Sequence, residues 1–456
     1  MSVAFVNKEK GMNSDKTLTT LELFSYARKL LLFRNVNQLV SSALVNSVWP
    51  VFIWFASTLL LIFIFGCEQE EGKTFQNACS CDDSCRLISL PKKERVDLSV
   101  EDVQYDFDIT AVYEDKSRTQ FWGYSDYEMK FYLFDLQAQD FLDTIPLARN
   151  GEHAVPEIFS FQPVTPDSIL LHTNHHNQLI LLNSKAERLK TWNIEGDLPN
   201  GGRADGLYYL SAWKNELSFH YDRAPNEATF FVTNTGFEGS HGVERFFYPQ
   251  FATLDLNTGK YLSAYGDYPA VYRDEEQSDY RADFPFAVAN GETWAVFYSS
   301  HCIYIFERDE SKRSVCSKSR FLPDQFEWLP RGLRVSERDP KLIPRGEYIN
   351  IIHDPYRNLF YRVVLHGLPD DTAVNRDWQV RKQSKWSIMI LDREGNCLGE
   401  ALFESSLYDY NQIFPVEEGL LVSLENPYNP DNEEELLSFQ LFDLGELPTR
   451  GEGSID

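Results

Sequence analysis

The chain has 456 residues, of which 43% are hydrophobic and 14% aromatic, so it can bury a sizeable core and is not disordered by composition. Lysine and arginine number 43 against 69 aspartates and glutamates, which gives a net charge of −26. This balance argues against a nucleic-acid partner, because the phosphates would be repelled instead of neutralised. The acidic residues are spread along the chain, so we interpret them as a solvated surface, with cation binding as the alternative.

The N-terminal region has the pattern of an export signal. Residues 35–67 contain no charged side chain, and 48–66 (VWPVFIWFASTLLLIFIFG) are almost entirely apolar. Basic residues precede this segment and the acidic run 68–71 follows it, which predicts a start in the cytoplasm with the rest of the chain exported. Ahead of it, residues 17–33 predict a helix.

The apolar segment allows two interpretations. Nineteen apolar residues can span a bilayer, so the segment could remain as a transmembrane anchor. Its end, Ile64-Phe65-Gly66-Cys67, resembles the lipobox of bacterial lipoproteins, in which a small residue precedes the lipidated cysteine. The acidic residues after Cys67 resemble the export tag of Bacteroidetes surface lipoproteins. We therefore expect lipidation at Cys67.

Six further cysteines allow 15 pairings, and the sequence does not choose among them: Cys79, Cys81, Cys85, Cys302, Cys316 and Cys397. The cluster at 79–85 suggests zinc, but the second cysteine pair that a zinc site needs is missing, so we predict no metal site. Disulfides or free thiols are expected in an exported protein. Cys302 and Cys316 flank one predicted hairpin and could be bridged.

From about residue 86 onward, short runs rich in Phe, Tyr, Val and Ile alternate with turn residues, which predicts an all-β fold. A four-strand unit recurs, and the second unit shows it best, with strands at 157–164, 168–173, 178–183 and 188–194. The other units begin at about 106, 216, 284, 348 and 411. The sixth unit has only three strands, and the last of these ends at residue 443.

Six units with one strand missing predict a six-bladed β-propeller, since closing the ring removes exposed sheet edges. The missing strand should come from the N-terminal side, from 86–90 or 95–100. An open β-sandwich, or two smaller β domains, is the alternative. The expected organisation is a pre-sequence with signal or anchor (1–66), an acidic cysteine-containing tether (67–85), the propeller (86–445) and a C-terminal tail (446–456).

The longest segments between strands are all links between blades or loops between second and third strands, so they should crowd one face of the ring: 195–212, 234–249, 266–282, 320–346, 366–385 and 425–435. Residues that open the innermost strands should ring the channel on that face: His153, Trp213, Arg281, Tyr348 and Tyr410. These side chains would suit a sugar, a peptide or another polar-aromatic ligand. The alternative is that they only fill the channel and cap the blades.

Motifs for known chemistries are missing from the sequence. It contains neither a G-x-S-x-G elbow nor a G-x-x-x-x-G-K phosphate loop, and we predict no cofactor. The adjacent His175 and His176 fall in a tight predicted turn, where neighbouring side chains rarely converge on one metal.

One motif carries a resemblance. His353-Asp354-Pro355-Tyr356-Arg357, followed by Phe360-Tyr361-Arg362, resembles an uncharacterised family of Bacteroidetes lipoproteins with TolB-like six-bladed propellers, over residues 86–443. Asp-Pro starts a turn and proline fixes its φ, so the motif predicts blade architecture as much as a ligand site. The resemblance implies no catalytic residues, because the family has no agreed activity. The long pre-sequence and the cysteine cluster depart from it.

These observations together predict an outer-membrane lipoprotein, on the cell surface or on the periplasmic side, whose propeller is a binding or interaction module. Its partners would be the membrane, through the lipid anchor, and a small-molecule, glycan or protein ligand. The alternative is a propeller enzyme, a hydrolase or lyase acting on sugars or lactones at the channel mouth. A structural envelope protein is a third possibility, favoured if the long loops pack together and leave no pocket.

Overall fold

Strands make up nearly all of the regular structure. The computed structural model describes residues 85–99, 107–114, 118–173, 177–199, 203–204, 219–232, 249–269, 272, 277–278, 284–309, 311–330, 333, 337, 341–368, 378–433 and 436–445. The predicted signal segment, the helix at 17–33 and Cys67 lie outside these residues. Within the described chain, no helix has the length and hydrophobicity to cross a membrane.

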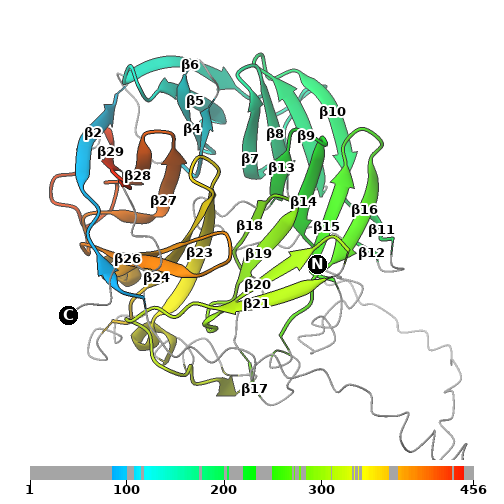
Figure 1. Ribbon diagram of the computed structural model, residues 1–456. Coiled ribbons are helices and arrows are strands. Elements are labelled where there is room, and N and C mark those ends of the chain that lie inside the picture. The colour runs from blue at the N-terminus through cyan, green and yellow to red at the C-terminus, as the bar shows by residue number, and fades with distance from the viewer. Residues whose placement is uncertain are drawn as a thin grey trace, which may run out of the picture. The chain divides into compact units, whose positions relative to one another are not determined.

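Six four-stranded arrays surround a central axis, as Figure 1 shows, and in each of them neighbouring strands run antiparallel. Blade 1 contains β3 (Ile109–Glu114), β4 (Thr119–Ser125), β5 (Lys130–Asp135) and β6 (Asp140–Pro146). Blade 2 contains β7 (Ile158–Thr165), β8 (Ser168–Thr173), β9 (Gln178–Asn183) and β10 (Arg188–Asn193). Blade 3 contains β13 (Phe219–Asp222), β14 (Glu227–Phe231), β15 (Phe251–Asp255) and β16 (Lys260–Tyr265).

The second half of the ring repeats this order. Blade 4 contains β18 (Phe286–Ala289), β19 (Glu292–Val296), β20 (Cys302–Glu307) and β21 (Lys312–Cys316). Blade 5 contains β23 (Glu347–Asp354), β24 (Leu359–Leu365), β25 (Trp386–Leu391) and β26 (Cys397–Phe403). Blade 6 contains β27 (Asp409–Val416), β28 (Gly419–Ser423) and β29 (Leu437–Phe442), and the six-bladed propeller predicted from the sequence is confirmed.

An N-terminal strand closes the ring. β2 (Lys92–Leu98) pairs antiparallel with β29 and becomes the fourth strand of blade 6, which confirms the predicted closure. The other candidate segment is also placed: β1 (Leu87–Ile88) adds to blade 5, parallel to β26. Just before β1, a disulfide joins Cys85 to Cys397, 312 residues later in the sequence. The start of the domain is therefore fastened to two neighbouring blades.

The core is divided into six apolar clusters, one between each pair of neighbouring blades. Alternate residues of a strand belong to the clusters on its two sides, as β18 shows with Phe286 and Val288 on one side and Ala287 and Ala289 on the other. A blade is therefore apolar on both faces, which explains why its inner strands are continuously apolar in sequence.

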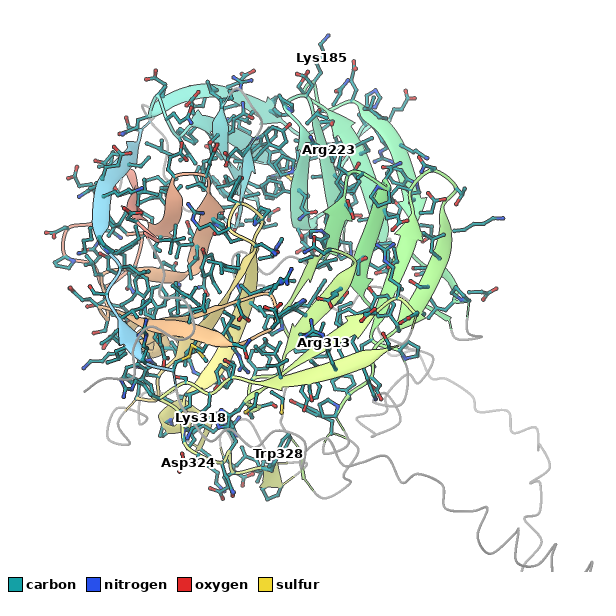
Figure 2. The ribbon with its side chains drawn as sticks, viewed as in Figure 1. Lys185, Arg223, Arg313, Lys318, Asp324 and Trp328 are labelled. Atoms are coloured by element: carbon teal, nitrogen blue, oxygen red, sulfur yellow. A yellow bond between two sulfur atoms is a disulfide. The ribbon has the colours of Figure 1, made fainter. Side chains whose placement is uncertain are left out.

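Two of the long segments meet in the described chain. β17 (Gln277–Ser278) pairs with β22 (Leu329–Pro330), and the ring of Trp328 packs edge-on against Tyr272 with 5.3 Å between ring centroids. Lys318 and Asp324, labelled in Figure 2 together with Trp328, form an ion pair in the segment after β21. The remaining short elements are β11 (Gly196–Asp197), β12 (Arg203–Ala204) and the 3-10 helices η4 (Ile343–Arg345) and η6 (Trp378–Gln383).

The Asp-Pro-Tyr-Arg motif forms the turn between β23 and β24. Asp354 accepts hydrogen bonds from the backbone amides of Tyr356 (2.9 Å) and Arg357 (3.1 Å), and from the Tyr361 hydroxyl (2.5 Å). The Arg357 guanidinium donates to the carbonyls of Val416 (3.0 Å) and Glu417 (2.7 Å) in blade 6. The motif thus builds the turn and ties blade 5 to blade 6, as its blade-architecture interpretation predicts.

A second polar contact joins blades 4 and 5. The fully buried Arg362 donates to the carbonyls of Ser300 (2.5 Å), His301 (3.0 Å) and Ser317 (2.7 Å). Its guanidinium also lies 3.3 Å from the ring centroid of Tyr348. Because burial lowers the pKa of Arg362 only to about 10, the group stays charged at neutral pH and its hydrogen bonds are charge-assisted.

Candidate functional site

A cavity of about 440 Å³ occupies the propeller axis, and all six innermost strands contribute to its wall. Its volume falls within the range of roughly 300–1,000 Å³ that is usual for small-molecule sites. The lining residues are Thr110, Ala111 and Val112 of blade 1; Gln162, Pro163 and Val164 of blade 2; Phe219, His220, Tyr221 and Arg223 of blade 3; Phe286, Ala287 and Val288 of blade 4; Asn350, Ile351, Ile352, His353, Pro355 and Tyr356 of blade 5; and Asn411, Ile413, Phe414 and Pro415 of blade 6.

The cavity reaches the turns that follow the innermost strands. Pro355 and Tyr356 belong to the β23–β24 turn, and Arg223 belongs to the turn after β13, where Figure 2 labels it. Each innermost strand begins at a link from the preceding blade and ends at one of these turns, so the turns and the links are at opposite ends of the strand. The cavity therefore lies toward the short-turn face, whereas the sequence analysis placed the ligand mouth on the long-loop face.

Polar side chains are unevenly distributed around the wall. Blade 4 contributes only apolar residues, and blade 1, opposite to it in the ring, contributes Ala111 and Val112 beside the buried Thr110. The other polar groups come from blades 2 and 3 on one side of the channel and from blades 5 and 6 on the other. No aspartate or glutamate is among the described lining residues. The cavity thus has two polar sides, two apolar sides and an interior without acidic groups.

Two histidines lie on either side of the apolar edge of blade 4. His220 is the second residue of β13 in blade 3, and His353 is the penultimate residue of β23 in blade 5. The pKa of His220 is lowered to about 4, chiefly by burial and also by the neighbouring His353 and Arg308, while Asp222 opposes the shift. Burial also lowers the pKa of His353. Both imidazoles are therefore neutral at physiological pH, when a ring has one hydrogen-bond donor and one acceptor. His353 already forms a hydrogen bond with the Asn358 side chain, so it has one ring nitrogen left for a ligand.

Side-chain amides supply further hydrogen-bonding groups. The Gln162 side-chain oxygen accepts from the Tyr221 backbone amide (2.6 Å), and the Asn350 side-chain oxygen accepts from the Ile351 amide (2.8 Å). These bonds fix the two oxygens and leave the amide NH₂ groups as donors. The wall therefore offers donors from the amides and both functions from the imidazoles.

The rim has charged groups, and each of them is held by a neighbour. The Tyr356 hydroxyl donates to the Glu114 carboxylate at 2.5 Å, which joins blade 5 to blade 1. Burial raises the pKa of Glu114, and the hydrogen bond from Tyr356 opposes that rise. Arg223 donates to the Val164 carbonyl and to the Tyr113 hydroxyl. The rim is thus pre-formed by contacts between blades.

The structure places three of the five predicted mouth residues. His153 is exposed in the β6–β7 link, and its Nδ1 accepts from the Arg188 amide at 3.3 Å. Tyr348 is fully buried, with the Arg362 guanidinium over its ring and a hydrogen bond to His301 (2.7 Å). Tyr410 is also buried, and the Lys382 ammonium is 4.8 Å from its ring centroid. None of the three lines the cavity, and Trp213 and Arg281 lie outside the described residues.

The predicted bridge between Cys302 and Cys316 has a suitable position. The two residues are opposite each other in the β20–β21 register, and both are disulfide-bonded. Their bonding to each other stays a prediction. In the part of the chain that the structure describes, no cluster of three or more His, Cys, Asp or Glu side chains could hold a metal ion.

The sequence analysis missed the residues that line the cavity, although it placed the strands that carry them. The available signal was the presence of polar residues inside otherwise apolar first strands, as with Asn350 and His353 within 348–353 and Asn411 within 411–416. Such residues are unfavourable in a closed interblade core unless they reach the channel or a hydrogen-bond partner.

The ring of six sheets and its axial cavity define a six-bladed β-propeller with a site large enough for a small molecule. Residues 88–402 match the family described as "Domain of unknown function (DUF4221)", and the chain belongs to that family. No curated protein matches the sequence.

A solved structure of the same family agrees with the fold. A DUF4221 member from Bacteroides vulgatus ATCC 8482 is 21% identical, with a TM-score of 0.62 over 78% of this chain and 98% of that one. A protein from Bacteroides fragilis NCTC 9343 described as exported is 10% identical, with a TM-score of 0.41 over 80% and 93%. Virginiamycin B lyase from Staphylococcus aureus is 9% identical, with a TM-score of 0.38 over 76% and 99%. With TM-scores under 0.5, the last two likenesses carry no functional argument.

Proposed function

We propose that this protein is an extracytoplasmic lipoprotein, tethered to the outer membrane through Cys67, whose propeller binds a small ligand in the central cavity. The observation that carries the binding role is the cavity itself, to which every innermost strand contributes. It is largely apolar, it is held by contacts between blades, and it contains a few polar groups that can orient a ligand. These are the usual properties of a small-molecule site.

The disulfide chemistry supports an oxidising compartment. Cys85 and Cys397 form a disulfide, and Cys302 and Cys316 are disulfide-bonded as well. Stable disulfides are rare in a reducing cytosol and common in exported proteins. This agrees with the export pattern of the N-terminal sequence, which ends at Cys67.

The composition of the cavity favours binding over hydrolysis or lyase chemistry. A hydrolytic site would need a carboxylate–histidine set or a nucleophile next to a base, whereas the described lining residues include no carboxylate. One serine–histidine contact exists elsewhere, between Ser387 Oγ and His366 Nε2 (2.9 Å). That serine is fully buried and its hydroxyl donates to Glu400 (2.7 Å), so it is not an accessible nucleophile.

Filling the cavity tests the binding role. The full chain, in a detergent without a sugar headgroup, is screened against a library of small fragments by ligand-observed NMR. Val112→Trp places a large ring in the wall at the channel, and Leu189→Trp is the matched control on the exposed outer strand of blade 2. We expect fragments that bind the wild type and the control but are lost with Val112→Trp, at unchanged melting temperature. Equal binding to both variants, or no binding at all, contradicts the proposal.

Mass spectrometry of the mature protein tests the tether separately. We expect the chain to begin at a diacylglyceryl-modified Cys67. An unmodified Cys67 inside a longer chain would reject the lipid anchor and leave the binding role to be judged from the cavity variants alone.

A further inference from the structure

We infer that the ligand of the central cavity is an uncharged carbohydrate ring and that His220 and His353 recognise its hydroxyl groups. The inference rests on the proposed function, since it names the ligand class of that same cavity. It depends on unsatisfied hydrogen-bonding groups in the wall, on the absence of acidic groups there, and on the order of polar and apolar blades around the axis.

The imidazole of His353 is hydrogen-bonded to the Asn358 side chain but is not fully satisfied. The Nε2 atom of His353 is buried and has no hydrogen-bond partner in the structure. The half-buried His220 lines the same cavity, and the two imidazoles are close enough to interact electrostatically. A buried polar group without a partner costs about 1–3 kcal/mol, so such groups in a cavity wall indicate that a bound molecule completes them.

The charge of the wall selects an uncharged ligand. A carboxylate would favour an ammonium ligand, and no aspartate or glutamate is among the described lining residues. Aromatic rings such as those of Phe219, Tyr221 and Phe286 do line the cavity, so an amino sugar is the comparison that tests the cationic alternative. A carboxylate ligand needs a free cation. Among the described lining residues the one cation is Arg223, which is at the exposed rim and donates to Val164 and Tyr113. The groups that remain are neutral imidazoles and amides, which suit hydroxyl and ring oxygens.

The order of the blades suggests the shape of the ligand. Polar groups from blades 2 and 3 face those from blades 5 and 6 across the channel, and the largely apolar edges of blades 1 and 4 lie between them. A sugar ring has hydroxyls around its perimeter, each of which both donates and accepts, and C–H groups on its faces. A volume of 440 Å³ corresponds to roughly fifteen water molecules in the liquid, which limits the ligand to one or two rings.

The test uses defined sugars as probes. The full chain in the same detergent is titrated with glucose, galactose, mannose, N-acetylglucosamine and their β-linked disaccharides. Glucuronic acid and glucosamine are charged comparisons. We expect at least one neutral sugar to bind, and the charged relatives to bind at least 10-fold more weakly.

Variants assign the binding to the two histidines. His220→Phe and His353→Phe each remove one polar partner while keeping a planar ring, and we expect each to weaken binding about 10-fold, as the loss of one buried hydrogen bond does. The matched control is His153→Phe, since His153 is exposed and away from the cavity. Melting temperatures within a few degrees of the wild type show that the variants are folded.

A pH series separates recognition from a structural role. Because burial lowers the pKa of both imidazoles from the usual 6.5, the affinity for a neutral sugar should be constant between pH 8.5 and pH 7.5. An affinity for glucuronic acid that exceeds the affinity for every neutral sugar and rises as the pH falls would show that the ligand is an anion, and would overturn the inference.

The outcomes distinguish this inference from the proposed function. If fragments bind in a Val112→Trp-sensitive manner but no sugar does, the carbohydrate assignment is wrong and the binding module stands. If neither fragments nor sugars bind, both are wrong.

Discussion

Replacing Arg362 with methionine should strongly destabilise the propeller. Methionine keeps the length and much of the volume of the side chain but cannot donate a hydrogen bond. The variant therefore leaves the three carbonyls of Ser300, His301 and Ser317 without the donor that blade 5 supplies to blade 4.

The size of the effect follows from these contacts. A hydrogen bond to a charged group contributes about 1.5–3 kcal/mol, and breaking a buried charged network by removing one member costs about 3–5 kcal/mol. Methionine also removes the burial cost of the guanidinium and of its Nε, which has no partner in the structure. We expect a net loss of about 3–4 kcal/mol in the free energy of unfolding.

Urea unfolding followed by tryptophan fluorescence measures this loss. With an m-value of about 2 kcal/mol per M, the midpoint should fall by about 1.5–2 M at unchanged m. Arg362→Lys keeps the charge but loses the fork of donors, so it should recover only part of the stability. The control is Arg393→Met, because that side chain is 72% exposed and should matter by less than about 0.5 kcal/mol. A loss below about 1 kcal/mol for Arg362→Met, or full recovery with lysine, would refute the role assigned to these hydrogen bonds.

Three further predictions concern stability. Cys85→Ser opens the disulfide that fastens the N-terminal strand. Loop-closure entropy for the 312-residue separation sets a ceiling of about 6 kcal/mol, and we expect a loss of about 2–4 kcal/mol by urea unfolding. An unchanged midpoint would show that the β2–β29 pairing alone closes the ring. Burial lowers the pKa of His172 to about 3 and that of His366 to about 4. Below pH 6.5 the unfolded chain therefore binds more protons at these histidines than the folded chain does. The free energy of unfolding should fall as the pH drops from 6.5 toward the two lowered pKa values. His172→Phe should therefore make the free energy of unfolding less dependent on pH. Between pH 6 and pH 5 the slope should fall by about 1.4 kcal/mol per pH unit. An unchanged slope would contradict the interpretation that the buried His172 imidazole is neutral in the folded chain. Tyr361→Phe removes the hydroxyl that donates to the buried Asp354 carboxylate, and it should lower the free energy of unfolding by about 1–2 kcal/mol in a thermal unfolding experiment. The control, Tyr127→Phe, changes a side chain that is 89% exposed and should have no measurable effect. Equal effects of the two variants would contradict a stabilising role for the Tyr361–Asp354 hydrogen bond.

The sequence determined the strands, their grouping in fours and the closure of the ring. Apolar runs such as 168–173, 178–183 and 359–365 coincide with β8, β9 and β24 because buried strands need continuous apolar residues between polar turns. The count of three strands in the sixth unit required a fourth from elsewhere, and β2 supplies it. Local composition was sufficient for these features because each blade is built from neighbouring segments.

The tertiary structure decided which side chains reach the axis. Irregularities in the register between Tyr348 and Asn350, and between Asp409 and Ile413, interrupt the alternation of the two innermost strands on which Asn350 and Asn411 lie. One such shift moves the following side chains to the other face of a strand, so a period-two pattern does not predict what the channel contains. The partner of Cys85 was equally hidden, because Cys397 comes near it only when the ring has closed. The fold follows from short-range pattern, whereas the cavity follows from the way six blades meet at one axis.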